Sequence, residues 1–138
     1  MLETAPSERA FLEDFFLYIY TARAHNDGSV DKFIEDVLAL PHKQSTEEVH
    51  AFLYAFVDHD TSHRLRDIAA PALVLAGGRD ITSRPELCRA VAERIPGARF
   101  EVLEEEAHQP FQEVPDEWNA RVDAFWREVR AREVRSVA

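Results

Sequence analysis

The feature that most constrains the fold is a strand–helix–strand pattern in the second half of the sequence. Residues 72–76 form a short, wholly apolar run after Pro71, which is typical of a strand buried on both faces. Residues 98–102 alternate apolar and charged side chains, as in a strand with one wetter face. Residues 85–94 between them have helical character, so we expect two parallel strands joined by a right-handed crossover.

Two parallel strands are too few to make a stable sheet by themselves. Parallel sheets are normally covered on both faces and contain several strands, and an isolated pair leaves backbone groups unpaired along its outer edges. We therefore expect further strands to come from another chain, from a second copy of this chain, or from a longer polypeptide of which these residues are a part.

The first half of the chain has only helical periodicity. Apolar residues recur every three or four positions in three segments, which predicts three amphipathic helices, each with an apolar face to bury. Ser45 and Glu48 have the reciprocal spacing of a capping box, and Ser83 and Glu86 repeat it before the helix at 85–94. The three segments are residues 7–24, 29–38 and 45–57, and Ser7 and Ser29 are the predicted caps of the first two.

Composition narrows the function classes. The chain has 16 basic and 26 acidic residues, a net charge of −10, and no basic stripe, which argues against a surface for nucleic acid or an anionic membrane. No segment approaches about 18 uninterrupted apolar residues, so no membrane span is expected. The only thiol, Cys88, allows neither an intrachain disulfide nor a cysteine-based zinc cluster. We expect a cytoplasmic protein without a metal or a cofactor.

Two chemically active side chains follow the two predicted strands. Asp80 comes shortly after the first strand, through a Gly-Gly turn, and His108 comes shortly after the second. Because functional groups collect beyond the carboxyl ends of parallel strands, which lie about 5 Å apart, we expect these two side chains to meet. An aspartate that orients a histidine and stabilises its protonated form is what a general base needs to activate a hydroxyl.

At these residues the chain resembles the C-terminal part of the α/β-hydrolase family. The resemblance covers residues 65–129 and rests on an ordered series: a strand, a G-x-x-D turn, a helix, Pro-Gly, a strand, a histidine, Glu-x-Pro and an aromatic helix. In that family the acid of the Ser-His-Asp triad follows the penultimate strand and the histidine follows the last strand. The resemblance therefore implies that Asp80 and His108 are catalytic. Ala107 stands where the family usually has a glycine before the histidine.

The resemblance also implies an α/β fold with two regions. Residues 1–64 would correspond to the helical cap of the family, and residues 65–138 to its last strand–helix–strand–helix part, with two parallel strands. The family's nucleophile elbow, G-x-S-x-G, is not found in these 138 residues. We therefore expect a chain that supplies the aspartate and histidine of a triad, while the serine and the oxyanion-hole donors come from elsewhere.

Two functions from different classes are compatible with these residues. In the first, the completed protein is a hydrolase that cleaves an ester or other acyl substrate, a small molecule, with the missing strands supplied by a complementing N-terminal polypeptide or a homo-oligomer. In the second, the chain is a non-catalytic interaction or dimerisation module derived from an α/β-hydrolase. Neither function involves nucleic acid or a membrane as a partner.

Two other polar clusters have plainer interpretations. Asp58, His59, Asp60 and His63 have spacings that metal ligands on one helical face could adopt, but a polar helix end explains them better. Residues 104–106 are three successive glutamates that could favour the charged form of His108, and a solvated acidic loop is the better prediction.

Overall fold

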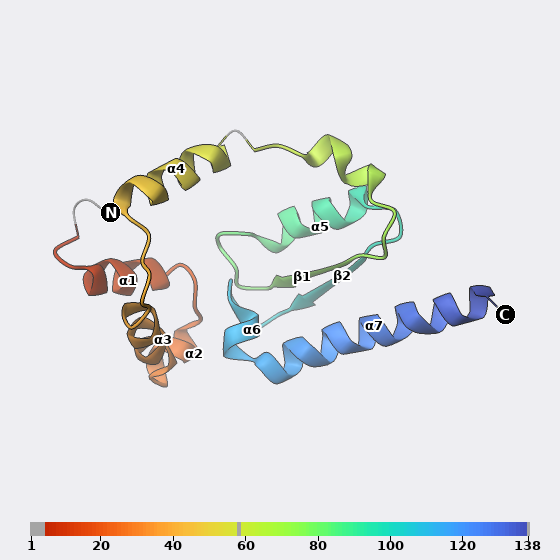
Figure 1. The fold of residues 1–138 in the computed structure, drawn as a ribbon. Coiled ribbons are helices and arrows are strands. Elements are labelled where there is room, and N and C mark those ends of the chain that lie inside the picture. The colour runs from red at the N-terminus through yellow and green to blue at the C-terminus, as the bar shows by residue number, and fades with distance from the viewer. Residues whose placement is uncertain (1–4, 58, 138) are drawn as a thin grey trace.

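The chain folds as a run of helices followed by alternating strands and helices (Figure 1). The computed structural model describes residues 5–57 and 59–137. The helical region contains α1 (Glu8–Phe16), α2 (Ala22–Asn26), α3 (Ser29–Leu38) and α4 (Thr46–Val57). The 3₁₀ helix η1 (Ser62–Asp67) leads into β1 (Leu73–Gly77), α5 (Pro85–Arg94), β2 (Arg99–Leu103), α6 (Pro110–Glu113) and α7 (Pro115–Val137).

The two strands pair in parallel, as the sequence predicted, with Leu73 opposite Arg99 at the start of the register. Helices α5 and α7 cover opposite faces of the pair. Arg89 of α5 lies over the ring of Phe100, 4.5 Å from its centroid, whereas Arg121 of α7 donates to Glu101 at 3.0 Å. Because successive residues of a strand point to opposite faces, these contacts place the two helices on different sides.

The described strand pair is only partly covered. Residues 72–76 were expected to be buried on both faces, but among them only Ala76 is fully buried, and Leu73, Val74 and Leu75 keep part of their surface exposed. Beyond the β1–β2 pairing, the described residues add no third strand to the sheet. The apolar character of β1 thus exceeds what its neighbours in this structure bury.

The core of the helical region is formed by α1, α2 and α3, and the predicted first helix is interrupted within it. The helix expected over residues 7–24 ends at Phe16, and α2 begins at Ala22. Thr21 causes the break because it adopts an extended backbone and its hydroxyl caps α2 by accepting from the Ala24 N–H. The buried core residues are Leu12, Phe16, Ile19, Tyr20, Ala24, Val30 and Ile34.

The capping predictions had mixed outcomes. Ser7 accepts from the Ala10 N–H as expected, and Ser45 and Glu48 form the reciprocal bonds of a capping box. Ser29 was the wrong cap, because Gly28 takes that position with a φ of +84°. The expected Ser83–Glu86 box was also wrong: Arg84 is the N-cap of α5, without a side-chain cap bond.

Helix α4 does not bury the apolar face that its periodicity predicted. Its large apolar residues are more than half exposed, because the described elements leave that side of the helix uncovered. The prediction of three helices with buried faces therefore holds for the α1 and α3 segments and is wrong for α4. The exposed residues are Phe52 (58%), Leu53 (53%), Tyr54 (77%), Phe56 (66%) and Val57 (80%). Within the described segments, no helix is both long enough and apolar enough to cross a membrane.

Two glycines after β1 allow the following loops to touch. A Cβ on Gly78 would lie 2.5 Å from the carbonyl oxygen of Glu104, and one on Gly77 would lie 2.6 Å from that of Glu106. The Gly78 N–H donates to the Leu103 carbonyl at 2.8 Å across the same gap. The turn after β1 and the loop after β2 are therefore in direct backbone contact, which only glycine permits.

We predict that Gly77→Ala lowers the free energy of unfolding by about 3 kcal/mol, because the new Cβ would displace a backbone segment that has no room to move. The matched control is Gly97→Ala. Gly97 has a φ of +70° and open space around its Cα, so its substitution should cost only about 1–2 kcal/mol of backbone strain. Urea denaturation followed by circular dichroism measures both, and equal losses would contradict the close-contact argument.

Candidate active site

Asp80 lies in the turn that follows β1, and its carboxylate accepts several hydrogen bonds. The side chain is 6% exposed. Its Oδ1 accepts from the backbone N–H groups of Thr82 and Ser83, each at 2.8 Å. Bonds of an aspartate to the backbone two and three residues later are a common way to build such a turn. The carboxylate is thus fixed in place by its own loop.

His108 lies in the loop between β2 and α6, and the structure brings it to Asp80. Its Nδ1 is 2.8 Å from Oδ2 of Asp80. Because an ionised carboxylate only accepts, Nδ1 carries the proton and Nε2 is left as the basic nitrogen. The side chain is 33% exposed, and Nε2 makes no hydrogen bond to any residue that the structure describes. An imidazole oriented in this way can take a proton from a hydroxyl placed at Nε2.

Thr82 is a third member of the site that the sequence did not reveal. Its Oγ1 lies 2.8 Å from Oδ1 of Asp80 and 2.7 Å from Nδ1 of His108. The hydroxyl donates to the carboxylate, so its oxygen lone pairs face the Nδ1–H of the histidine. A threonine two residues after an aspartate is common in turns, and no motif marked this one in advance.

The surroundings of Asp80 keep it ionised. Burial by itself raises the pKa of this carboxyl group, but the hydrogen bonds from His108, the Ser83 N–H, and the hydroxyl and N–H of Thr82 outweigh it. The net effect is a pKa below the ordinary value of 3.8. An Asp80 that is charged at neutral pH can stabilise the imidazolium that His108 forms when it accepts a proton.

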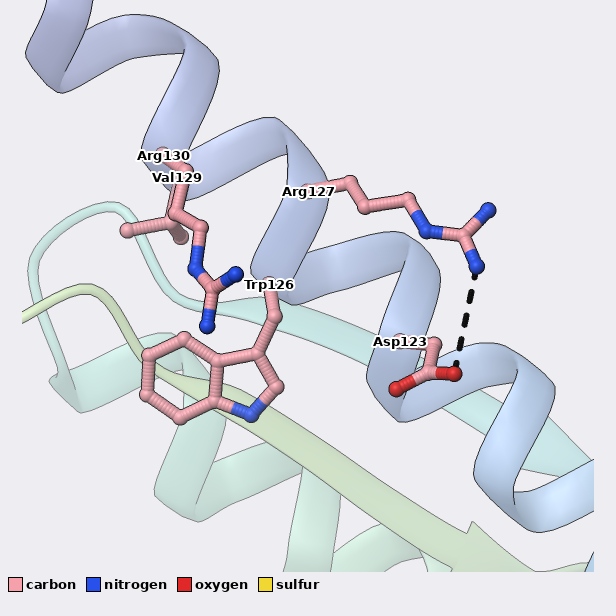
Figure 2. Close-up of a pocket in the computed structure, with 5 residues that line it drawn as sticks. All are labelled: Asp123, Trp126, Arg127, Val129 and Arg130. Atoms are coloured by element: carbon pink, nitrogen blue, oxygen red, sulfur yellow. Dashed lines mark ion pairs between the residues drawn. The ribbon is translucent and has the colours of Figure 1, made fainter.

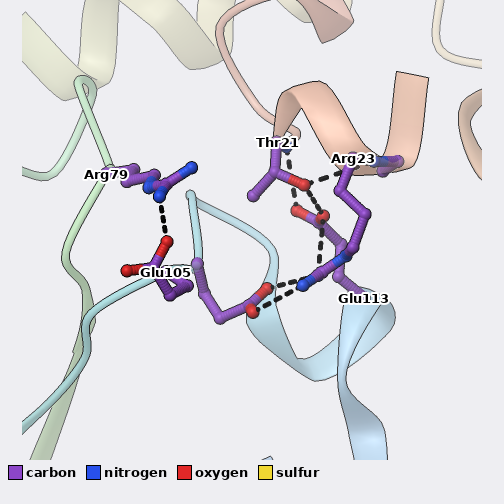
Figure 3. Close-up of polar contacts among 7 residues, drawn as sticks. Thr21, Arg23, Arg79, Glu105 and Glu113 are labelled. Atoms are coloured by element: carbon purple, nitrogen blue, oxygen red, sulfur yellow. Dashed lines mark hydrogen bonds and ion pairs between the residues drawn. The ribbon is translucent and has the colours of Figure 1, made fainter. Parts of the chain in front are cut away.

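The acidic loop before His108 is only partly solvated, so the expectation for residues 104–106 was wrong at Glu106. Glu104 and Glu105 are exposed, whereas Glu106 is buried and forms a two-pronged ion pair with Arg23, at 3.0 and 2.7 Å. The bond with Glu106 is also the largest cause of a raised pKa of Arg23. Figure 3 shows Arg23 and, apart from it, the contact between Arg79 and Glu105.

Glu113 joins the same group of buried charges. It accepts from Arg23 at 3.3 Å and from the backbone N–H of Thr21 at 3.1 Å, and it also binds the Thr21 hydroxyl (Figure 3). In the sequence Glu113 was noted only as part of the Glu-x-Pro pattern. Its burial depends on a partner 90 residues earlier in the chain, which local patterns do not indicate.

Neither of the other candidate regions forms a site. Helix α4 ends at Val57, so His59 and His63 do not share a helical face, and Asp58 lies outside the described residues. The described residues contain no cluster of three or more side chains that could hold a metal ion.

The hollow along α7 in Figure 2 is lined by five residues of that helix, with Asp123 and Arg127 paired at 3.9 Å, and it contains neither Asp80 nor His108.

Replacing Asp80 by asparagine tests the charge state of the site. Because the pKa of Asp80 is lower in the folded chain than in the unfolded chain, its stabilising contribution is complete well above pH 3.8 and is lost as the pH falls through the folded-state pKa. The difference in unfolding free energy between the parent chain and Asp80→Asn should therefore shrink between about pH 6 and about pH 2.

Urea denaturation at a series of pH values measures this difference. Asp14→Asn, at an exposed position of α1, is the control for removing a carboxylate and should show a much smaller pH-dependent change. A constant difference for Asp80→Asn over that range would show that the Asp80 carboxylate is not stabilised in the folded chain.

Known proteins that are similar to this chain include an esterase, a lactonase and a further hydrolase. It is 31% identical over 85 residues to a pimeloyl-[acyl-carrier protein] methyl ester esterase of Neisseria meningitidis, a match that covers 62% of this chain and 32% of the relative. The enol-lactonase of Burkholderia xenovorans has a TM-score of 0.75 and 25% identity, covering 90% of this chain and 47% of that one. An alpha/beta fold family hydrolase of Bacillus anthracis has a TM-score of 0.63 at 22% identity, covering 85% and 40%.

No protein-family model matches the chain. The chain spans about a third of the length of the curated relative and about half the length of the enol-lactonase. The order of elements, the parallel pairing and the shared sequence agree with the last strands and helices of those proteins. The chain resembles members of the α/β-hydrolase family and has the fold of the C-terminal part of those proteins.

Proposed function

We propose that this chain supplies the acid and the base of a Ser-His-Asp triad in a hydrolase that cleaves an ester or related acyl substrate. The observation that carries the proposal is the 2.8 Å contact between His108 Nδ1 and Asp80, which leaves Nε2 as the proton acceptor. The serine would come from residues outside these 138, since the sequence holds no G-x-S-x-G.

The reaction follows from this geometry. His108 Nε2 takes the proton of the serine hydroxyl as its oxygen attacks the ester carbonyl carbon, and Asp80 stabilises the resulting imidazolium. The imidazolium then protonates the departing alcohol, which leaves an acyl-serine. Water attacks the carbonyl carbon of the acyl-serine while Nε2 accepts its proton, and the imidazolium returns that proton to the serine oxygen as the acid product leaves. Each step passes one proton through Nε2, so the orientation of the imidazole matters throughout.

The names of the relatives support an ester-like substrate. A methyl ester esterase and an enol-lactonase both act on a bond between an acyl group and an oxygen. We propose the same bond class for the completed form of this protein, with a small molecule as the substrate. In that form residues 1–64 would cover the site as a cap, and the single Cys88 would suit a cytoplasmic location.

A second candidate function is a non-catalytic interaction module. It is favoured by the exposed apolar face of α4, where Phe52, Tyr54 and Phe56 are all more than half exposed. The partly uncovered β1 adds apolar surface elsewhere on the molecule. Both features also suit the first candidate, because a complementing polypeptide or a second copy would cover the same surfaces.

A chimera tests the catalytic proposal. The N-terminal half of the Burkholderia enol-lactonase is joined to this chain at the start of the aligned region and assayed with p-nitrophenyl acetate. The chimera should hydrolyse the ester, and His108→Ala should reduce the rate by about 10³-fold or more, because the serine then has no base. His63→Ala, at an exposed histidine of η1, is the control and should retain the parent rate.

The chain without the added half should hydrolyse the ester no faster than buffer. If the chain alone is active and His108→Ala abolishes that activity, a nucleophile lies within these 138 residues and the proposal is wrong about its source. If a folded chimera is equally active with and without His108, the proposed role of the histidine is wrong.

Because apolar residues of α4 and, in part, of β1 are exposed, we predict that the 138-residue chain by itself forms dimers or larger oligomers. Sedimentation should give a mass above 15.8 kDa that rises with concentration, since exposed apolar side chains of this extent favour burial against a partner. Phe52→Glu with Phe56→Glu should weaken the association, whereas Leu17→Glu, at a residue 63% exposed on another element, should not. A concentration-independent monomer would contradict the argument.

A further inference from the structure

Two buried carboxylates lie on either side of His108 in the chain. The side chains of Glu106 and Glu113 are 5% and 1% exposed, and they are separated from the histidine by two and five positions. A buried charge is costly unless it is paired and hydrogen-bonded. In the described part of the chain both carboxylates are paired with the same cation, Arg23, which donates to Glu106 through both terminal nitrogens and to Glu113 through one (Figure 3).

The segment that carries Arg23 holds the histidine loop at several points. The Ile19 carbonyl accepts from the His108 N–H at 3.0 Å, and the Thr21 N–H donates to Glu113 at 3.1 Å. Residues 19–23, which run from the end of the α1–α2 connection into the first turn of α2, thus bind residues 106–113 at both ends and at the histidine itself. The main chain of Glu106 also accepts from the Arg79 N–H at 2.9 Å, next to Asp80.

These contacts connect Arg23 to the His108–Asp80 distance. If Arg23 were lost, two buried carboxylates would remain close together without a cation, and the loop would have to move to hydrate them. His108 lies within that loop, whereas the carboxylate of Asp80 is fixed by N–H groups of its own turn after β1, which touches the loop through its backbone. Movement of the loop would therefore shift the imidazole away from its acceptor rather than carry both groups along.

We propose that Arg23 is a positioning residue for His108. By neutralising Glu106 and Glu113 at once, it holds residues 106–113 where the Nδ1–H of the imidazole meets Asp80. The importance of Arg23 for catalysis rests on the proposed function. The effect of Arg23 on the position of His108 does not. The two-pronged geometry explains the use of arginine, because a lysine presents a point charge that cannot bind both oxygens of Glu106 and also reach Glu113.

The same loop provides a matched control. Arg79 pairs with Glu105, one position before Glu106, but their side chains are 59% and 71% exposed (Figure 3). Exposed ion pairs contribute little, because water and salt screen them. Arg79→Gln removes a cation from the loop as Arg23→Gln does, without leaving a buried charge unpaired.

The experiment is NMR spectroscopy of the 138-residue chain, with two readouts at His108. The ¹⁵N shifts of the neutral imidazole report which nitrogen carries the proton, and amide exchange of the His108 N–H reports its bond to Ile19. Arg23→Gln should shift the tautomer from Nδ1–H toward Nε2–H and speed the amide exchange by about tenfold or more. Arg79→Gln should leave the tautomer unchanged and the exchange within about twofold.

A purely structural role would destabilise the chain without changing the tautomer in the folded state. If the Arg23→Gln chain folds and keeps the parent tautomer and exchange rate at His108, the proposal is wrong. If Arg23→Gln does not fold, Arg23→Lys decides, because a lysine keeps the positive charge but cannot bind both oxygens of Glu106 and also reach Glu113. A folded Arg23→Lys chain with the parent spectrum at His108 would overturn the proposal, and the tautomer shift would support it. Neither readout needs esterase activity, so an inactive chimera would count against the proposed function alone.

Discussion

The arrangement of the site depends on the close approach of two backbone segments, the turn after β1 and the loop after β2. Parallel pairing places the ends of the two strands side by side, but the carboxylate and the imidazole meet only because the loops beyond the strands are also in contact. Gly77 and Gly78 make that contact possible, since a side chain at either position would collide with main-chain oxygens of residues 104–107. The Asp80–His108 bond is therefore a consequence of backbone packing.

Electrostatic pairing then holds the packed loops in one arrangement. Three acidic side chains are buried near the site, and each is matched by donors: Asp80 by its turn and His108, and Glu106 and Glu113 by Arg23. The chain has a net charge of −10, so such carboxylates would repel one another if they were not paired. A buried carboxylate in this region is stable only with its specific partner. Because Arg23 of α2 is the partner of Glu106 and Glu113, the helical region is bound to the loop that carries His108.

The sequence predicted those features that depend on local patterns. The two strands, their parallel pairing and the meeting of Asp80 with His108 followed from apolar runs and from the rule on strand ends. The burial of Glu106 was missed because it depends on Arg23, far away in the chain. The break at Thr21 has a local cause, an N-cap of α2, but the apolar residues on both sides of it keep a helical spacing. The exposed face of α4 was missed for a related reason, since periodicity shows that a face is apolar but not what covers it.

The His–Asp pair is formed by contacts that lie wholly within the described residues. Its orientation comes from the Asp80 turn, from Thr82, and from the bond between the His108 N–H and Ile19. The imidazole of His108 therefore loses its rotational freedom when this chain folds, which in the proposed hydrolase would happen before a nucleophile is present. A serine added by other residues would meet a base that already has its tautomer and direction. In the proposed hydrolase those residues would supply the nucleophile and the oxyanion donors. Further residues would also cover β1 and α4, neither of which is fully covered by the residues described.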